Sequence, residues 1–211
     1  MKLALVADEL LKTELLSISP SKKVEWVWLN SVDELNAQDD ADAVIDLLFS
    51  NNEAEVKLLK EFLPRPVIVN SVLLTLKEIN YPFIRINAWP GFLKREITEA
   101  TCNNEAGKIA GEKIFSTLGR KVEWVPDITG FISPRVIAMI INEAYFALEE
   151  KVSTKEEIDT AMKLGTNYPF GPFEWADKIG LKNIFELLNM LSLKEKRYQP
   201  APLLIKEAGE K

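Results

Sequence analysis

Short β-rich runs alternate with helical patterns as far as residue 125, and this alternation narrows the choice of fold more than any other feature. The runs are "LALVA" (3–7), "VEWVWL" (24–29), "AVIDLLF" (43–49), "PVIVNS" (66–71) and "PFIRINAW" (82–89). Between them, "NEAEVKLLKEFL" (52–63) places Val56, Leu59 and Leu63 on one helical face. Strands that alternate with helices are typical of a parallel sheet covered by helices. The sequence therefore predicts an α/β fold for this half.

A helix and a last strand complete this half. The stretch "NNEAGKIAGEKIFSTLG" places one apolar stripe on a helix, made of Ala106, Ile109, Ala110 and Ile114. Gly119 is suited to end that helix, because glycine adopts the left-handed backbone that closes many helices. "KVEWVP" (121–126) then has the composition of a strand. We expect an α/β domain over residues 1–126.

After Gly130 every strong pattern is helical. Apolar residues recur at the i, i+3, i+4 and i+7 spacing of a long amphipathic helix; they are Ile137, Ile140, Ile141, Ala144, Tyr145 and Leu148. Further helices are expected over residues 181–191 and 202–208. The sequence therefore predicts an all-α domain over residues 127–211.

A second helix in this half carries a capping box, in which a Ser or Thr and a Glu three residues later satisfy backbone N–H groups. The sequence leaves two pairs open, Ser153 with Glu156 and Thr154 with Glu157. We expect this helix to end at Gly165.

The stretch "GTNYPFGPFEWADKIG" (165–180) holds two prolines, three glycines and four aromatic residues, too many turn residues for one helix or strand. It is interpreted as an interhelical corner, with the next helix beginning at Pro172 or Phe173. The aromatic side chains are expected to anchor this corner in a core or a dimer interface; they are Tyr168, Phe170, Phe173 and Trp175.

The chain has no histidine, which removes the commonest general acid/base, the Ser–His and Cys–His nucleophile systems and most zinc sites. No metal site is expected. The net charge is −6 and no run is rich in Lys or Arg, so nucleic acid is not an expected partner. No apolar run approaches the roughly 18 residues of a membrane span, and the N-terminus does not resemble a signal peptide. The single Cys102 fits a reducing compartment. We expect a cytoplasmic protein without a membrane partner.

The turn after the first strand bears on cofactor binding. A dinucleotide site needs a glycine-rich turn there, so that the pyrophosphate can approach backbone N–H groups. Here Asp8 and Glu9 follow the strand, and no glycine precedes Gly91. Two carboxylates would repel a diphosphate, so no cofactor is expected at this turn. Asp33 and Asp42 lie where a ribose-binding acid would be sought, but a cap or loop role is the simpler interpretation.

Residues 130–181 and the later "RYQPAPLL" resemble the C-terminal domain of the 3-hydroxyacyl-CoA dehydrogenase family, which includes the 3-hydroxybutyryl-CoA dehydrogenases. The resemblance rests on Gly130, Phe131, Ile132, Arg135, Asn142, Glu143, Ala144, Ile158, Asp159, Ala161, Met162, Gly165, Tyr168, Pro169, Gly171, Pro172, Phe173, Glu174, Ala176, Asp177, Gly180 and Leu181. It continues more weakly upstream through "ITEAT" and "KIFSTLGRKVEWVPD". It implies a Rossmann-like α/β domain, here shortened, and then the helical domain. It also implies NAD as cofactor, a role in fatty acid metabolism and a homodimer formed through the helical domain.

The resemblance also implies where site residues would fall. In that family a histidine takes the proton of the 3-hydroxyl, a glutamate orients the histidine, and a serine and an asparagine contact substrate oxygens. The glutamate position falls on Glu99 and the histidine position on or beside Asn87. The asparagine position at the helix start falls on Pro134, next to Ser133. The serine position matches Ser71 only after a shift of register. By their own chemistry, Ser71 and Ser133 are cap or turn hydroxyls, and asparagine is no proton base near neutral pH.

Three functions remain open. The joint loss of the base, the hydroxyl partner and the cofactor turn favours a catalytically degenerate relative, a pseudoenzyme that keeps the family fold and an acyl-CoA-type ligand. The second function is an active NAD(P)-dependent 3-hydroxyacyl-CoA oxidoreductase with altered site residues. The third is an interaction or scaffold module that dimerises through wide apolar helix faces, although an intramolecular core explains those faces equally well.

Overall fold

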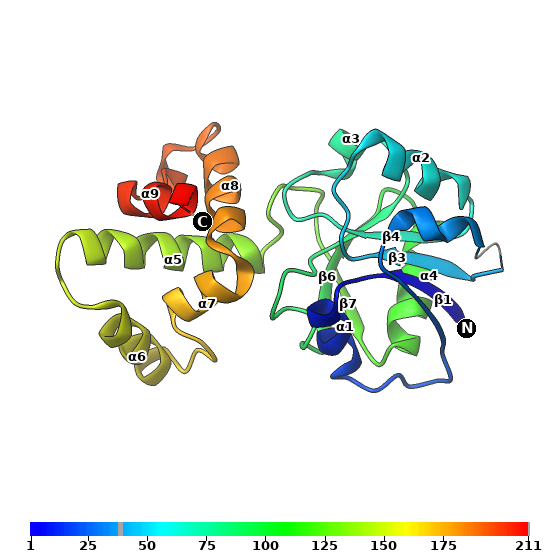
Figure 1. Cartoon of the computed structure of the whole chain (residues 1–211), viewed down its shortest axis with the longest axis horizontal. Helices are drawn as coiled ribbons and strands as arrows, with labels where there is room; N and C mark the ends of the chain where they lie inside the picture. Colours follow the sequence, from blue (N-terminus) through cyan, green and yellow to red (C-terminus); the bar gives the residue numbers. More distant parts are fainter. Residues whose placement is uncertain (38–39, 211) are drawn as a thin grey trace. The chain divides into compact units, whose positions relative to one another are not determined.

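The computed structural model of the chain describes residues 1–37 and 40–210. Within these residues, seven strands form one sheet in the order β2-β1-β3-β4-β5-β6-β7 (Figure 1). The strands are β1 (Lys2–Val6), β2 (Glu25–Leu29), β3 (Ala43–Asp46), β4 (Val67–Asn70), β5 (Ile84–Ile86), β6 (Ile97–Thr101) and β7 (Lys121–Trp124). The first five strands run parallel to one another, as the alternation of strands and helices predicted.

The pairing of β5 with β6 departs from the predicted parallel sheet, because these two strands are antiparallel. The connection from Ile86 to Ile97 is shorter than the dozen or so residues that a parallel crossover needs. The strand β7 then pairs parallel with β6 after a full helical crossover. One short loop therefore reverses the direction of the last two strands.

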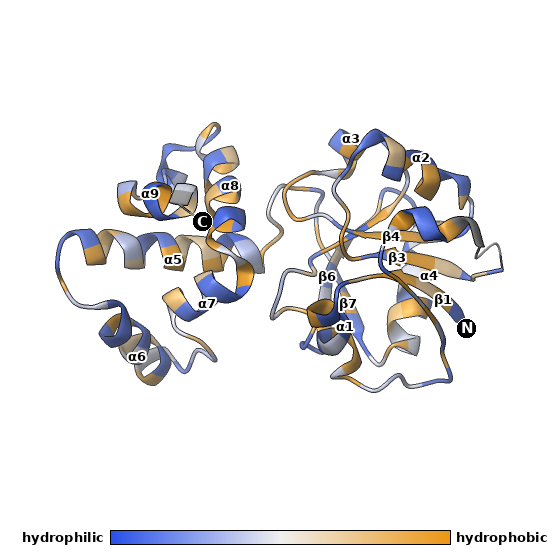
Figure 2. Cartoon of the chain, in the orientation of Figure 1, coloured by the Kyte–Doolittle hydropathy of each residue, from blue (hydrophilic) through white to orange (hydrophobic). Residues whose placement is uncertain are grey.

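Helices cover both faces of the sheet (Figure 1). One face packs against α1 (Glu9–Leu16) and α4 (Glu105–Thr117). The other packs against the 3-10 helix η1 (Val32–Ala37), α2 (Glu53–Glu61) and α3 (Leu76–Ile79). The central strands are apolar in Figure 2 except at their ends, where β1 begins with Lys2 and β3 ends with Asp46, as expected for strands that are buried on both faces.

Two strands are shorter than predicted, because polar side chains at their carboxyl ends turn the chain out of the sheet. The strand predicted over 43–49 ends at Asp46, whose Oδ1 accepts a hydrogen bond from the Leu48 N–H at 2.9 Å. The strand predicted over 82–89 pairs only at Ile84–Ile86, and the Ala88 N–H then donates to Asn70 Oδ1 at 2.9 Å. Side-chain bonds of this kind compete with the ladder of a sheet.

The helix α4 buries only part of the predicted stripe. Gly111 and Ile114 are buried, whereas Ala106 is exposed and Ile109 is 61% exposed. A Cβ atom at Gly111 would lie 3.0 Å from the ring of Trp124. The helix therefore lies close to Trp124 of β7 at Gly111, and the amino-terminal part of the predicted stripe, Ala106 and Ile109, is left uncovered.

The predicted end of one helix is confirmed, and the predicted end of another is wrong. Gly119 follows α4 with a left-handed φ of 74°, as predicted. The helix α6 (Lys155–Thr166) does not end at Gly165, and the left-handed residue is Asn167 with a φ of 55°. Asparagine tolerates this backbone region well enough to close a helix.

The second half is helical, with α5 (Ser133–Glu149), α6, α7 (Pro172–Ile179), α8 (Leu181–Ser192), η2 (Lys196–Tyr198) and α9 (Pro202–Glu210). The predicted stripe of α5 is buried at Ile137, Ile141, Ala144 and Tyr145. The chain divides into two compact units, Met1–Phe131, the α/β unit, and Ile132–Lys211, the helical unit. The predicted fold class, a Rossmann-like α/β sheet followed by helices, is confirmed.

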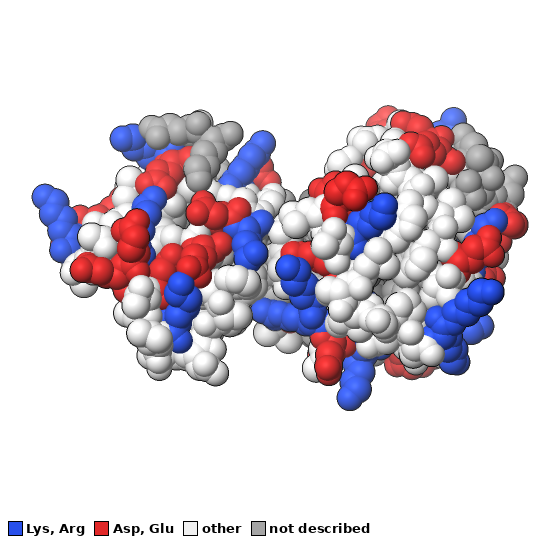
Figure 3. Space-filling model, turned by 60° about the horizontal axis from the view of Figure 1, so that its bottom comes forward, with Lys and Arg blue, Asp and Glu red and all other residues white. Residues whose placement is uncertain are grey.

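The surface and the helices bear on possible partners. Figure 3 shows acidic and basic side chains interspersed over the face that it displays, as the absence of a basic run in the sequence suggests. No helix in the described part of the chain is both long and apolar enough to cross a membrane.

Candidate functional site

Asn87 and Glu99 lie against each other at the carboxyl end of β5. Asn87 is 4% exposed, and its backbone N–H donates to the carbonyl of Glu99 at 3.1 Å. Its side-chain Nδ2 donates to Glu99 Oε2 at 3.2 Å, while its Oδ1 accepts a longer bond from the Trp89 N–H at 3.4 Å. The antiparallel β5–β6 register produces this pairing. The amide orients a carboxylate but cannot take a proton near neutral pH.

Two neighbouring polar side chains at the end of β4 have structural partners. Asn70 Nδ2 donates to the carbonyl of Leu47 at 3.1 Å, and its Oδ1 accepts from Ala88, so that this side chain joins three strand ends. Ser71 is buried, and its hydroxyl donates to the carbonyl of Leu74 at 3.2 Å. The turn role expected for Ser71 therefore matches its contacts. Sequence reasoning overlooked Asn70, although a polar residue that ends a buried strand was a usable signal.

Ser133 and Pro134 belong to the helical unit, at the start of α5. Pro134 is buried in the first turn, where its missing N–H leaves no helical bond unmade. Ser133 is half-buried. Asn87, Glu99 and Ser71 belong to the α/β unit.

The turn after β1 does not fit a dinucleotide. Asp8 is the N-cap of α1, and its Oδ1 accepts a hydrogen bond from the Leu11 N–H at 2.8 Å. Glu9 adds a second carboxylate in the first helical turn. The helix N-terminus that would hold a diphosphate is thus occupied by the chain's own acid.

A cavity of about 240 Å³ lies where β1 ends, and it is lined by polar residues that include Asn30, Ser31, Asp33 and Glu55. Asp33 accepts a hydrogen bond from the Ser31 hydroxyl at 3.0 Å, within the first turn of η1. Asp42 lies instead before β3, where its Oδ2 accepts from the Lys2 N–H at 2.7 Å. Carboxylates at this cavity would also repel a diphosphate.

A buried pair of carboxyl groups stands beside this cavity. Asp46 is fully buried, and among the described residues no N–H or O–H donates to its Oδ2. Burial, and then the neighbouring Glu55, raises the pKa of Asp46 to about 7. Glu55 is buried as well and accepts from the N–H and the hydroxyl of Ser50, each at 2.9 Å. Protonation of Asp46, which its raised pKa favours, would let its carboxyl group donate to Glu55. No pattern in the sequence indicates this pair.

The loop that follows Asn87 is anchored from α1. Glu14 is 2% exposed, and both of its carboxylate oxygens accept from the Gly91 N–H, at 2.9 and 2.7 Å. Gly91 has a φ of 90°, a conformation that favours glycine. Sequence reasoning overlooked Glu14, because nothing local marks a contact between residues so far apart in the chain.

The corner at 165–180 caps the amino-terminal end of α7. The Asp159 carboxylate accepts from the backbone N–H groups of Phe173 at 2.8 Å and Glu174 at 3.2 Å, at the start of α7. Glu174 in turn accepts from the Gly171 N–H at 2.9 Å and forms an ion pair with Lys163. A Cβ atom at Gly171 would lie 2.3 Å from Asp159 Oδ1, so only glycine fits. Burial is the first cause of the raised pKa of Asp159.

Other residues of the helical motif also hold the fold together. Phe173 and Trp175 are buried, whereas Tyr168 and Phe170 are half-buried. Asn142 Nδ2 donates to the carbonyl of Gln199 at 2.9 Å, and its Oδ1 accepts from Ala201 at 2.8 Å, which fixes the segment before α9. No group of three or more Cys, Asp or Glu side chains in the described ranges could hold a metal ion.

The comparisons with known proteins agree with this architecture. A family model described as "3-hydroxyacyl-CoA dehydrogenase, C-terminal domain" matches residues 130–210. A solved structure of (S)-3-hydroxybutyryl-CoA dehydrogenase from Ralstonia eutropha has a TM-score of 0.75 at 21% identity, covering 99% of this chain and 93% of that one. At that identity the likeness shows the fold.

Sequence relatives carry the match into the α/β unit. A probable 3-hydroxybutyryl-CoA dehydrogenase of Bacillus subtilis is 31% identical over 188 residues, which are 82% of this chain and 66% of that protein. A 3-hydroxybutyryl-CoA dehydrogenase of Bradyrhizobium diazoefficiens is 38% identical over 118 residues, 54% of this chain and 40% of that protein. The chain spans less than two thirds of the length of these relatives. The chain belongs to the 3-hydroxyacyl-CoA dehydrogenase family.

Proposed function

We propose that this chain is a catalytically degenerate member of its family, which binds an acyl-CoA-type ligand and does not transfer hydride. The observation that carries the proposal is the hydrogen bond from Asn87 to Glu99, 3.2 Å between Nδ2 and Oε2. If Asn87 occupies the family's histidine position, the orienting carboxylate remains while the proton acceptor is an amide. An amide at that position can bind a substrate oxygen but cannot remove a proton from a hydroxyl.

The turn after β1 supports the same proposal. Hydride transfer needs a bound nicotinamide cofactor, and Asp8 and Glu9 stand where its diphosphate would approach α1. The Asp8 carboxylate already satisfies the Leu11 N–H. We also propose that the predicted domains, residues 1–126 and 127–211, correspond to the two compact units.

The ligand part of the proposal rests on Asn87. Its Nδ2 carries two N–H groups, and one of them donates to Glu99. Within the described residues no acceptor takes the other, so it can donate to a thioester or 3-oxo oxygen. The relatives are named as dehydrogenases of 3-hydroxyacyl-CoA compounds, which suggests the class of ligand.

Calorimetry and a coupled assay test the two parts separately. We expect acetoacetyl-CoA to bind, NAD and NADP not to bind, and acetoacetyl-CoA-dependent NADH oxidation to equal the buffer rate. Asn87→Ala should weaken acetoacetyl-CoA binding about tenfold, which is the loss of roughly one hydrogen bond. The exposed Asn103→Ala is the matched control. Measurable NADH oxidation would establish the alternative, an active oxidoreductase, and no binding at millimolar concentration would remove the ligand part.

A homodimer formed through the helical unit is a second candidate function. Three large apolar side chains of this unit are strongly exposed, Val152 at 69%, Leu164 at 83% and Leu193 at 82%. Light scattering should then give a dimer, and Leu164→Asp with Leu193→Asp should give a monomer that remains folded. Leu10→Asp in α1, where Leu10 is 51% exposed, serves as the control. A monomeric wild type would reject this candidate.

A further inference from the structure

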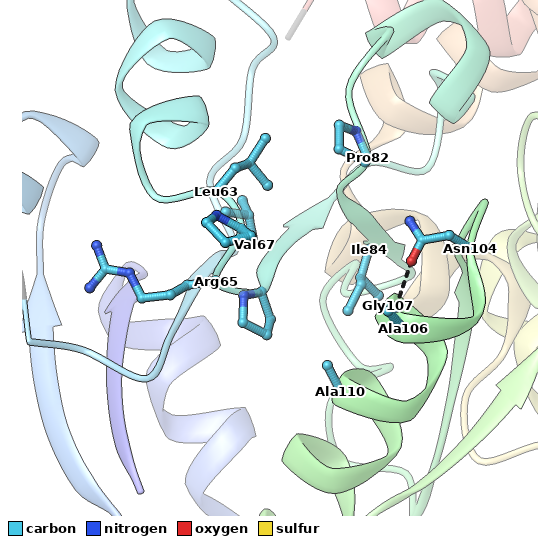
Figure 4. A pocket seen from close by; sticks show the side chains of 11 residues that line it. Leu63, Arg65, Val67, Pro82, Ile84, Asn104, Ala106, Gly107 and Ala110 are labelled. Atoms are coloured by element: carbon cyan, nitrogen blue, oxygen red, sulfur yellow. Dashed lines mark hydrogen bonds between the residues drawn. The ribbon is translucent and has the colours of Figure 1, made fainter.

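A groove runs along the edge of the sheet at which β4 and β5 begin, opposite to the edge that carries Asn87. Its cavity is about 470 Å³, within the roughly 300–1,000 Å³ of typical ligand pockets. The segment from Leu63 to Val67 forms one wall, and Ile84 with the first turns of α4 forms the other (Figure 4).

The walls of this groove are mostly apolar. They include Pro64, Pro66, Pro82, Ala106 and Ala110. Ala106 and Ala110 belong to the amino-terminal part of the apolar stripe that the sequence predicts on α4, where Ala106 is exposed and Ala110 is half-buried. An apolar stripe that is left open on a lined cavity suits an apolar occupant.

The polar groups in the walls favour hydrocarbon over peptide. Asn104 Oδ1 accepts from the Gly107 N–H at 2.7 Å, and Arg65 donates to the carbonyl of Ala41 at 3.1 Å. No carboxylate lines this groove among the described residues. A bound peptide would need partners for its own backbone N–H and C=O groups, whereas an alkyl chain needs none.

The groove continues into a second, basic cavity. This cavity is about 520 Å³ and shares Pro66 and Ala110 with the first. Lys22, Lys23 and Lys113 line it, all three are exposed, and none pairs with a carboxylate among the described residues. One carboxylate, Asp42, also lines it, and its Oδ2 accepts from the backbone N–H of Lys2 at 2.7 Å. A basic cluster stands out on a chain whose net charge is −6, and it suits an anionic group.

From this juxtaposition we propose that the two cavities bind one anionic amphiphile, with its alkyl chain along α4 and its phosphate or carboxylate head at Lys22, Lys23 and Lys113. The site lies at the amino-terminal edge of the sheet, so it is separate from the residues of the proposed acyl-CoA site and does not depend on that proposal. The ligand classes that fit are alkyl phosphates and fatty acids.

Calorimetry with hexyl, octyl and decyl phosphate tests the site, with each compound below its critical micelle concentration and circular dichroism showing that the fold persists. We expect the dissociation constant to fall about fourfold per added methylene, which is the effect of roughly 0.8 kcal/mol for each buried CH₂. Octanol should bind at least tenfold more weakly than octyl phosphate. Octanoate, run in parallel, shows whether a carboxylate head is accepted as well as a phosphate.

Variants locate the two ends of the ligand. Lys22→Gln with Lys23→Gln and Lys113→Gln should remove the preference for octyl phosphate over octanol. The matched triple variant changes exposed lysines elsewhere in the same unit to Gln, at Lys57, Lys60 and Lys77, and should keep that preference.

Blocking the apolar groove should weaken decyl phosphate binding at least tenfold, and Ala106→Trp is the blocking variant. Ala161→Trp, on an exposed position of α6, should not change binding. The proposal would be overturned if the dissociation constant did not depend on the length of the alkyl chain. It would also be overturned if binding were unchanged in both the triple lysine variant and Ala106→Trp. A dimer that Ala106→Arg dissociates would overturn it too, because a second copy would then cover the groove.

Discussion

In the helical unit, the acids of the family motif hold helix ends, because Asp159 and Glu174 accept the first N–H groups of α7 and of the turn before it. In the α/β unit, Asp8 and Asn87 stand at proposed cofactor and substrate positions, and their polar atoms bond to the chain itself. The residues of the helical motif therefore make contacts that stabilise the fold. The presence of the motif indicates the fold of this unit. In the α/β unit the internal bond of Asp8 takes a helix N–H that a diphosphate would need, whereas the bond of Asn87 to Glu99 leaves one of its N–H groups for the proposed ligand.

The largest effect is expected in the α/β unit, at the ion pair between Arg85 and Asp127. Arg85 is fully buried, and its Nη1 lies 2.5 Å from Asp127 Oδ1. The Asp127 carboxylate also accepts hydrogen bonds from the backbone N–H groups of Leu76 and Lys77. Asp127→Ala leaves a buried charge without a carboxylate, so the free energy of unfolding should fall by about 3–5 kcal/mol. Urea denaturation measures it, with the exposed Glu53→Ala as control. A loss below about 1 kcal/mol would contradict the assigned role.

The helical unit should respond nearly as strongly at the glycine of its corner. Gly171→Ala places a Cβ atom 2.3 Å from Asp159 Oδ1 and forces the capping contact apart. We expect the free energy of unfolding to fall by about 2–3 kcal/mol. At Gly165, within α6, a Cβ atom would meet no atom within 4 Å, and Gly165→Ala should raise stability by about 0.5–1 kcal/mol. Equal effects at the two glycines would show that the cap does not shape this unit.

The pH dependence of stability should originate in the α/β unit. Because the pKa of Asp46 is raised to about 7, the folded protein keeps a proton that the unfolded chain releases near pH 4. This contribution is complete below about pH 4 and is lost as pH rises through about 7, so the free energy of unfolding should fall by about 1.4 kcal/mol per pH unit between these values. Asp46→Asn should flatten the curve, measured by urea denaturation between pH 4 and 8. Asp33→Asn, at an exposed residue, should leave the slope unchanged.

The smallest change in the free energy of unfolding is expected at the capping box of α6, for which the sequence allowed two residue pairs. The structure selects Thr154 with Glu157, since the Glu157 N–H donates to Thr154 Oγ1 at 3.3 Å and the Thr154 N–H donates to Glu157 Oε2 at 3.2 Å. Thr154→Ala should cost about 1 kcal/mol. Ser153 only donates its hydroxyl to Glu157, so Ser153→Ala should cost less than about 0.5 kcal/mol. The reverse order in thermal melts would assign the box to Ser153.

Patterns within short stretches predicted much of the fold. The spacing of apolar residues along α5 predicted its buried face at Ile137, Ile141 and Ala144, and Gly119 marked the end of α4. These features depend on the 3.6-residue period of a helix and on the backbone freedom of one residue type, and both can be read from neighbouring residues.

Contacts between residues that are far apart in the chain could not be predicted from such patterns. The rotation of α4 depends on the close approach of Gly111 to Trp124, and the loop after Asn87 depends on the bond from Gly91 to Glu14. No local spacing encodes either contact.

For the candidate site, the amino-acid sequence by itself determined that no histidine is available and that carboxylates follow the first strand. Only the tertiary structure decided that Asn87 bonds Glu99, because this pairing follows from the antiparallel register of β5 and β6. Only the tertiary structure placed Asp46 beside Glu55 and left Ala106 and Ile109 of the α4 stripe uncovered. The physical reason is that composition and helical period belong to single segments, whereas register and helix rotation depend on segments that meet only in the folded chain.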